Sequence, residues 1–444
     1  MAAEHGQGAC GHSRETREKE AGAPAQASGS GRAGGWSVVF CGLGLNLALG
    51  VLYAWSVFAK QMTEPVASGG LGLTKTEASL PYMLAIGVFA LVMVPAGRLQ
   101  DKVGPRLAAL CGAVLTGLGL LVSSFVEPGN LTPVLAGFGL LAGAGFGLGY
   151  AATTPAAIKW FPPEKKGLIT GIVVSGFGLA PVYIAPLARW LLEVHGVAGA
   201  FRILGAGFTV VAVLLATRIV NPPASHSPAS SASSTQPGPG AASPAPSGPA
   251  GQGWRDMVRT RAFWLLYAQY AFAALAGLMV IGHLARIIAV QSGGAVQAGF
   301  LFVASLAVFN ALGRLMAGLL SDRLGRMATL RMVCLGQAVA MALFPTLTGM
   351  VGFFVGSAAV GFCYGACLAL FPATVGDFWG ARGFGLNYGL LFTAWGLGGV
   401  FGPLLAGAIA DATGGYGLAC RLAALLVLTA AGLSLLTRRP AAQH

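Results

Sequence analysis

Twelve apolar runs, each about twenty residues long, divide this chain and restrict its fold more than any other feature. A helix of that length crosses the hydrocarbon core of a bilayer, and backbone groups inside lipid must find their hydrogen-bond partners within the segment. The sequence therefore predicts an all-α membrane protein with twelve transmembrane helices. The predicted spans are 36–59, 78–97, 107–126, 132–158, 167–190, 199–220, 261–288, 298–320, 329–349, 351–376, 385–410 and 417–437.

Composition agrees with this prediction and removes several classes of protein. Hydrophobic residues make up 55% of the chain and charged residues only 9%, well below the share of about 25% in soluble domains. The seven cysteines show no paired loop spacing, so we predict neither a disulfide framework nor a metal site, although Cys363 and Cys367 share a helix face. No HExxH, GxSxG or carboxylate pair lies within a span, and we expect neither a cofactor nor an enzymatic activity.

A segment rich in Pro, Ser, Ala and Gly separates the sixth predicted span from the seventh. Such a composition cannot bury a core and is typical of a flexible linker. We expect the chain to act as a monomer. The predicted domains are a disordered cytoplasmic tail (1–35), an N-terminal six-helix bundle (36–221), a cytoplasmic linker (222–253), a C-terminal six-helix bundle (254–437) and a second cytoplasmic tail (438–444).

Lysine and arginine residues lie mostly on one side of the predicted topology. With the N-terminus in the cytoplasm, twenty of the 27 basic residues fall on cytoplasmic segments and five on outer segments. Cytoplasmic loops of membrane proteins carry such an excess, so both termini are predicted to face the cytoplasm, in a multi-pass protein of the cytoplasmic (inner) membrane. The net charge of +13 then reflects topology and contact with anionic lipid, and we expect no nucleic-acid partner.

The two predicted bundles repeat each other in sequence. GRLQDKVGPR (97–106) follows the second span and GLLSDRLGRM (318–327) follows the eighth, and their aspartates are 221 positions apart. A second pair matches GLITGIVVSGFGLAP, which begins at Gly167, with GLNYGLLFTAWGLGG, which begins at Gly385. Parallel repeats of this kind produce two bundles that enclose a substrate site at their interface.

Arg314 lies inside the eighth span, where an unpaired cation costs about 2.5–3.5 kcal/mol. Asn310, four residues earlier, shares its helix face. All fourteen Asp and Glu residues lie in loops, in tails or at predicted helix ends, so a diffusible anion is the favoured partner. The alternative is a structural arginine held by backbone carbonyls or by a carboxylate on another helix. The first half has Phe89 and Met93 at the corresponding positions, which favours a role in the site.

Several segments carry a family resemblance. The motif after the second span and its copy after the eighth are similar to the loop signature of the major facilitator superfamily. Further similar segments are GVLYAWSVF (50–58), AGAGFGLGY (142–150), KWFPPEKKGLITG (159–171), FNALGR (309–314), ALFPATVGDFWG (369–380) and NYGLLFTAW (387–395). With these segments the chain resembles the oxalate/formate antiporter family, which also contains bacterial monocarboxylate transporters. The resemblance implies a carrier that works by alternating access.

The resemblance also implies which residues bind the substrate. Arg314 falls on a substrate-binding arginine of the family, and Asn310 lies beside it. The positions that line the substrate cavity of the antiporter are aromatic here as well. Three of these positions are tyrosines, and each would offer a hydroxyl donor on an apolar side chain, which suits a small carboxylate. They are Tyr53, Tyr150 and Tyr364.

Three departures from the oxalate antiporter predict the charge of the substrate. A lysine, a glutamine and a second helix-10 aromatic residue of that protein are replaced here by Trp395, Leu52 and Leu368. A single arginine grips one carboxylate, while the second charge of a dianion would face apolar groups. We therefore expect a small monocarboxylate such as lactate, pyruvate, glycolate or formate. Its organic tail would contact Phe392, Trp395, Leu52, Phe177 and Leu368.

The two copies of the loop motif predict a latch on the cytoplasmic side. Charged side chains of each copy would form a cluster that holds one state of the carrier, and the alternative is a solvated turn after each helix. The predicted clusters consist of Asp101 with Arg98 and Arg106, and of Asp322 with Arg323 and Arg326.

Two modes of energy coupling are left open by the sequence. No acidic residue lies within a span to carry a proton, and His283 of the seventh span is predicted to pack near the outer interface. We favour symport of a proton with the substrate, and exchange of one monocarboxylate for another is the rival. A carrier for a sugar or a drug is the alternative within the superfamily, although sugar sites usually show more Asn and Gln in the spans.

Overall fold

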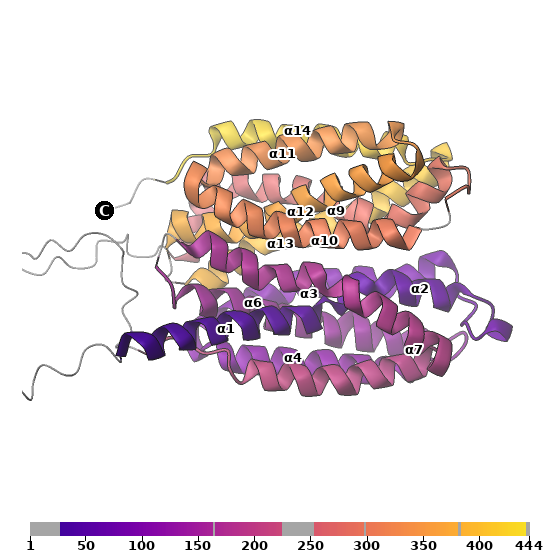
Figure 1. The fold of residues 1–444 in the computed structure, drawn as a ribbon, viewed down its shortest axis with the longest axis horizontal. Coiled ribbons are helices and arrows are strands. Elements are labelled where there is room, and N and C mark those ends of the chain that lie inside the picture. The colour runs from indigo at the N-terminus through magenta and orange to yellow at the C-terminus, as the bar shows by residue number, and fades with distance from the viewer. Residues whose placement is uncertain (1–26, 163–164, 224–252, 297–298, 381–382, 441–444) are drawn as a thin grey trace, which may run out of the picture.

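The computed structural model describes residues 27–162, 165–223, 253–296, 299–380 and 383–440. Most of the two predicted tails and of the predicted linker lies outside these residues. The described helices run along one axis in two packed layers (Figure 1). The N-terminal half, coloured indigo to magenta, forms one layer, and the C-terminal half, coloured orange to yellow, forms the other.

The N-terminal half supplies six spans. The first combines α1 (Ala27–Leu49), the 3₁₀ segment η1 (Gly50–Ala54) and α2 (Trp55–Thr63), and a 3₁₀ turn, η2 (Val66–Ser68), follows it. The second and third are α3 (Lys75–Val103) and α4 (Pro105–Ser123). The fourth combines α5 (Thr132–Val134), the π-helical η3 (Leu135–Ala142) and α6 (Gly143–Ile158). α7 (Lys166–Ala216) contains the fifth and the sixth, because Gly196 at φ 67° interrupts its helical geometry.

The C-terminal half begins with a short helix, α8 (Trp254–Arg259). Its six spans are α9 (Arg261–Gln291), α10 (Gly299–Leu324), α11 (Arg326–Leu343) with the 3₁₀ turn η5 (Phe344–Thr346), α12 (Gly349–Trp379), α13 (Phe384–Thr413) and α14 (Gly417–Leu436). Among the described residues, 11 helical stretches are long and apolar enough to cross a membrane, and α7 counts twice. The prediction of an all-α membrane protein with twelve spans in two six-helix bundles is confirmed.

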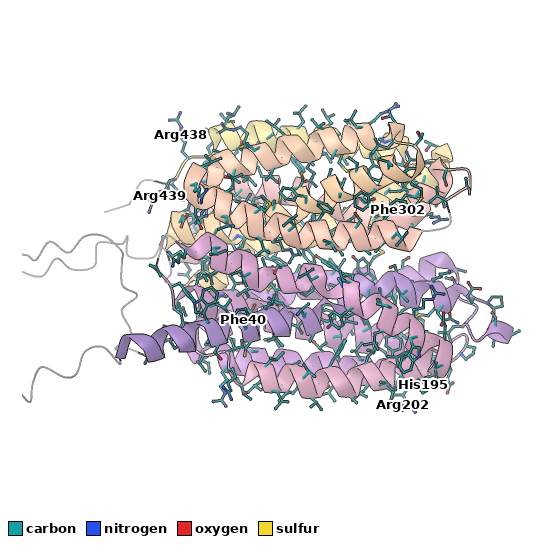
Figure 2. All side chains as sticks on the ribbon, viewed as in Figure 1. Phe40, His195, Arg202, Phe302, Arg438 and Arg439 are labelled. Atoms are coloured by element: carbon teal, nitrogen blue, oxygen red, sulfur yellow. The ribbon has the colours of Figure 1, made fainter. Side chains whose placement is uncertain are left out.

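The two ends of the molecule carry different parts of the chain. Arg438 and Arg439 lie at one end of the long axis, and His195 and Arg202 lie at the other (Figure 2). Successive spans alternate in direction, so the links from α3 to α4 and from α10 to α11 lie at the same end as Arg438. We call this end the motif end.

Both copies of the motif are more helical than predicted. α3 continues to Val103 and α10 to Leu324, beyond the predicted ends at 97 and 320. A single glycine then joins each pair of helices, Gly104 at φ 105° and Gly325 at φ 88°, a region that favours glycine. The predicted spans ended too early because the apolar runs stop at the charged residues, whereas the helices continue through them.

Close packing at the interface of the two halves depends on glycine. α3 packs on α13, and α7 packs on α10. A Cβ added at Gly389 would lie 2.4 Å from the carbonyl oxygen of Met93, and one at Gly171 would lie 2.6 Å from that of Arg314. Side chains cannot approach backbone so closely, so these glycines let the helices meet. The approach brings the side chains of α7, α10 and α13 into one central region.

Candidate functional site

A small cavity lies between the two halves. Its volume is about 10 Å³, roughly what one water molecule requires. The N-terminal half supplies four of its lining residues and the C-terminal half supplies the other four, and all of them are buried. The lining consists of Tyr53, Phe89, Tyr150 and Phe177 from the first half, and of Arg314, Leu368, Phe392 and Trp395 from the second.

The structure brings most of the predicted substrate-binding residues to this cavity. Asn310 and Tyr364 are not part of the lining, but each hydrogen-bonds to a residue that is. Leu52 is buried outside the lining, so its predicted contact with the substrate has no counterpart in this conformation. It precedes Tyr53 in η1, and successive residues of a 3₁₀ turn point in different directions.

Phe89 of α3 belongs to the lining and was not predicted. Its ring centroid is 5.6 Å from that of Tyr150 and 5.2 Å from those of both Phe392 and Trp395. The sequence could have indicated this position, because the offset of 221 residues between the two halves relates Phe89 to Asn310. A residue that occupies the place of a site residue in the other half is expected at the same interface.

Arg314 is fully buried on α10. Its Nε donates a hydrogen bond to Oδ1 of Asn310 at 2.9 Å, and its Nη1 donates one to the backbone carbonyl of Val174 on α7. Its Nη2 has no hydrogen-bond partner within the described chain, and no Asp or Glu described there forms an ion pair with it. The contact with the carbonyl of Val174 agrees with the alternative that Arg314 is a structural arginine held by backbone carbonyls. Its Nη2, which has no partner, and the adjoining cavity are instead suited to an anion.

The shape of α7 makes room for this guanidinium. A Cβ added at Gly178 would lie 3.2 Å from Nε of Arg314 and 3.0 Å from Oδ1 of Asn310. Both separations are tighter than ordinary side-chain contacts, so a larger residue would displace the Arg314–Asn310 pair. Gly178 therefore allows Arg314 to lie against α7, where it reaches Val174.

A hydrogen-bonded chain of aromatic side chains crosses the interface beside Arg314. The hydroxyl oxygens of Tyr53 and Tyr364 are 2.9 Å apart, and Nε1 of Trp395 donates to the hydroxyl of Tyr364 at 2.8 Å. Tyr53 belongs to η1 in the first half, while Tyr364 and Trp395 belong to α12 and α13 in the second. The chain therefore ties the two halves together at the cavity.

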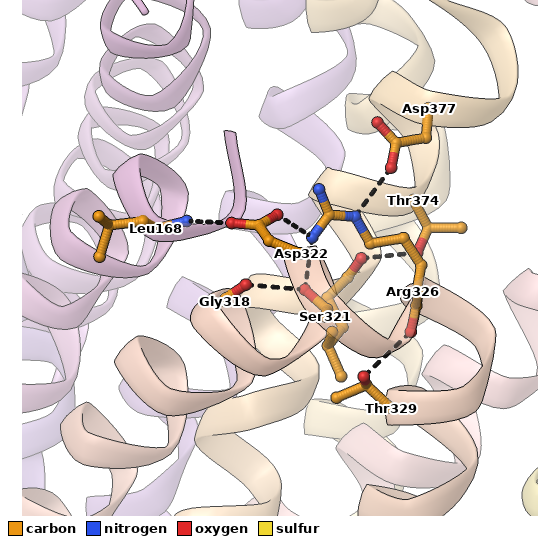
Figure 3. Close-up of polar contacts among 10 residues, drawn as sticks. Leu168, Gly318, Ser321, Asp322, Arg326, Thr329, Thr374 and Asp377 are labelled. Carbon is orange, nitrogen blue, oxygen red and sulfur yellow. Dashed lines mark hydrogen bonds and ion pairs between the residues drawn. The ribbon is translucent and has the colours of Figure 1, made fainter. Parts of the chain in front are cut away.

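The second copy of the motif forms a compact charged cluster (Figure 3). Arg326 pairs with Asp322 at 2.6 Å and with Asp377 of α12 at 2.8 Å, and it also donates a hydrogen bond to Ser321. Asp322 accepts a further hydrogen bond from the backbone N–H of Leu168, on α7, at 3.2 Å. Of the predicted cluster, Asp322 and Arg326 are paired here, and Asp377 is an unpredicted member. Arg323 is exposed and forms no ion pair among the described residues.

The first copy is different, and the predicted pairing there is wrong. Arg98 and Arg106 are exposed, and in the described chain neither pairs with Asp101. Asp101 instead accepts hydrogen bonds from the backbone N–H groups of Gly385 and Leu386, at 3.2 and 3.0 Å. Pro105 directly follows Gly104 at the place that Arg326 has in the second copy, so no arginine follows this linking glycine directly.

His283 lies away from the cavity lining. Its Nε2 is 3.0 Å from the carbonyl oxygen of Pro403, and its Nδ1 is 3.5 Å from the hydroxyl oxygen of Tyr416. Both partners belong to the C-terminal half, so these contacts tie helices of one bundle together, as expected for a packing role.

Comparison with known proteins gives the family. The sequence matches the model of the Major Facilitator Superfamily over residues 36–352 and again over residues 294–444. The chain belongs to this superfamily. This major facilitator protein is 29% identical to the oxalate:formate antiporter of Oxalobacter formigenes over 365 residues, which cover 81% of each chain. It is 27% identical to monocarboxylate transporter 13 of Bos taurus over 404 residues, 90% of this chain and 88% of that protein.

The fold of this major facilitator protein is also found among solved structures. It resembles the fucose:proton symporter FucP of Escherichia coli with a TM-score of 0.61 and 16% sequence identity, over 89% of this chain and 98% of that one. At this identity the match supports the fold alone. The predicted resemblance to the superfamily and to the oxalate/formate antiporter is confirmed. The protein is a multi-pass membrane transporter of the superfamily.

Proposed function

We propose that this protein carries small monocarboxylates across the membrane by alternating access, with Arg314 as the receptor for the carboxylate. One observation carries the proposal: a fully buried arginine borders a small, mostly aromatic cavity between the halves and pairs with no Asp or Glu of the described chain. A buried cation without a counter-charge is strongly destabilising, so it attracts a small anion. The planar guanidinium matches the two oxygens of a carboxylate.

The walls of the cavity favour a single negative charge and a short organic tail. Phe177, Leu368 and Phe392 offer no donor, and no lining residue besides Arg314 carries a positive charge, so a second carboxylate would lose its hydration without gaining a counter-charge. Lactate, pyruvate and formate meet both conditions. Small carboxylates as a class are also supported by the names of the two relatives, an oxalate:formate antiporter and a monocarboxylate transporter.

The proposed topology places the motif end in the cytoplasm and the protein in the cytoplasmic membrane. Support comes from the distribution of basic residues along the chain and from Arg438 and Arg439, which lie at this end. In the proposed cycle the two halves rock about the cavity, and the contacts of Asp101 and Asp322 hold the motif end closed in one state.

Symport of a proton with the monocarboxylate is the coupling we propose. The cavity lining contains no Asp, Glu or His, so the proton would travel with the substrate rather than on a side chain of the lining. Exchange of two monocarboxylates is the second candidate function. The identity to the antiporter of Oxalobacter formigenes favours it.

Purified protein in proteoliposomes tests the proposal through uptake of labelled lactate at two pH values. Unlabelled lactate and pyruvate are expected to compete, while oxalate is expected to compete weakly because it brings a second charge. Faster uptake at the lower external pH is expected for proton symport. Oxalate that competes as well as lactate would contradict the single-charge argument.

Replacing the arginine is the sharpest test of the site. Arg314→Lys is expected to lower lactate uptake by about a hundredfold, because an ammonium group cannot form the paired hydrogen bonds of a guanidinium and loses its contact with Val174. Arg286→Lys is the matched control, since it alters another arginine of the spans that does not line the cavity. If the Arg314→Ala variant inserts normally and still transports lactate, Arg314 does not bind the substrate.

A further inference from the structure

The described conformation closes the site without leaving space for a carboxylate. The cavity measures about 10 Å³, roughly the requirement of one water molecule, and a carboxylate is larger. The side chains around it are all buried, and the most exposed of them, Tyr53, is 8% exposed. The two halves therefore meet in an arrangement that a substrate-loaded carrier cannot adopt.

Closure over a bare guanidinium should be strongly unfavourable. A buried charge that loses its partner typically suppresses the state that contains it by a factor of about a hundred or more. In this conformation, however, Nη1 of Arg314 donates to the carbonyl oxygen of Val174. Arg314 belongs to the C-terminal half and Val174 to the N-terminal half. The carbonyl oxygen of Val174 therefore accepts, across the interface, a hydrogen bond that a carboxylate oxygen of the substrate would otherwise accept.

A second contact acts in the same way. The hydroxyl groups of Tyr53 and Tyr364 hydrogen-bond to each other across the interface at 2.9 Å. A carboxylate in the cavity would compete for these donors, and the tyrosines would have to separate to admit it. One nitrogen of Arg314 and the two tyrosine hydroxyls are therefore used for contacts between the halves in this arrangement, while Nη2 of Arg314 has no hydrogen-bond partner in the described chain.

We propose that these two contacts replace the substrate and enable net transport: after releasing a monocarboxylate, the halves close on each other and return without a second anion. The inference rests on the proposed function, and it adds the groups that allow the carrier to return without a substrate. An obligatory exchanger needs the opposite design, a charged site that cannot close unless an anion neutralises it.

Proteoliposomes separate the two modes. Uptake of labelled lactate is measured into vesicles loaded with buffer alone and into vesicles loaded with unlabelled lactate. Net uptake within about a hundredfold of exchange supports the inference, because a bare buried charge would slow the return by more than that. Exchange that is faster than net uptake by a larger factor overturns the inference and the proposed symport, and it leaves binding and transport of monocarboxylates at Arg314 intact. Neither uptake nor exchange of any monocarboxylate would reject the proposed function, and the inference with it.

Removing a tyrosine hydroxyl tests the residues. Tyr53→Phe and Tyr364→Phe each abolish the cross-half hydrogen bond, and each is expected to raise the ratio of exchange to net uptake by about fivefold, even where both rates fall. Tyr267→Phe is the matched control, because its hydroxyl contacts Thr393 at 3.0 Å within the C-terminal half. The measured exchange rate reports that each variant is folded. An unchanged ratio in both variants, or an equal rise in the control, would overturn the role of the tyrosine pair.

Discussion

The two copies of the motif occupy related places at the motif end but are built differently. In the second copy Arg326 pairs with both Asp322 and Asp377, and the side chains of Arg326 and Asp322 are only 9% and 14% exposed. In the first copy Asp101 is exposed and forms no ion pair with any described residue. One copy is a nearly buried charge cluster, and the other is a single carboxylate at the surface.

Both aspartates nevertheless make the same kind of contact. Asp101 accepts hydrogen bonds from the backbone N–H groups of Gly385 and Leu386 at the start of α13, and Asp322 accepts one from Leu168 at the start of α7. The first N–H groups of a helix have no acceptor within it and lie at the positive end of its dipole. Each carboxylate therefore binds the beginning of a helix in the opposite half.

One position explains much of the difference between the copies. Arg326 directly follows the linking glycine and reaches back to Asp322, whereas Pro105 stands at the corresponding place in the first copy. Proline suits the first turn of α4 but brings no charge, and Arg106 beyond it is exposed. The contact between the halves is therefore common to both copies, while the ion pairs occur only in the second copy among the described residues.

The largest effect on this comparison is expected from Arg326→Ala. It leaves Asp322 and Asp377 facing each other without a cation in a mostly buried cluster, so the free energy of unfolding in detergent should fall by about 2–3 kcal/mol. Thermal unfolding of the purified protein measures it. Arg323→Ala is the matched control, because this neighbouring arginine is exposed and should change stability by less than about 0.5 kcal/mol. Equal losses in the two variants would mean that the cluster adds no stability.

Asp101→Ala should have a smaller effect, confined to the closure of the motif end. It removes two hydrogen bonds between the halves and is expected to shift the balance toward the state open at this end by about 1–2 kcal/mol. Spin labels on cysteines placed at Arg218 and Arg323, both exposed and in different halves, report the change by pulsed EPR once the native cysteines are replaced. An unaltered distance distribution would show that the contact does not hold the end closed.

The fold could be predicted from the sequence because lipid leaves few alternatives. Apolar runs of sufficient length must be helices, and a polar segment midway between two sets of six divides them into bundles. The ends of the helices at the motif were predicted less well. Hydropathy stops at the first charge, whereas a helix at the membrane surface continues until a residue such as Gly104 or Gly325 ends it.

The candidate site was predicted where one residue type was decisive and missed where packing decided. Arg314 stood out because no acidic residue lies inside a span, and the structure places no described carboxylate beside it. Phe89 is one of many phenylalanines in apolar runs, and only the repeat distinguishes it. Asp377 lies 51 residues from Arg326, so their ion pair depends on how α12 packs, which no local pattern contains.

Pro105→Arg tests whether the residue after the linking glycine explains why the first copy lacks the ion pair of the second. Its effect is expected to be the smallest of those predicted. The new arginine would follow the linking glycine as Arg326 does, but Asp101 is exposed, so the pair should favour the closed motif end by only about 0.5 kcal/mol. Lys159, which follows α6, feels the charge of the same carboxylate without pairing with it: burial lowers its pKa, the charge of Asp101 partly opposes this, and its Nζ donates to Asn221. An effect of about 0.5 kcal/mol should raise the ratio of closed to open populations in the spin-label distance distribution about twofold. Pro105→Gln removes the proline without adding charge, and a shift of equal size in that variant would mean that loss of proline, rather than a new ion pair, changed the first copy.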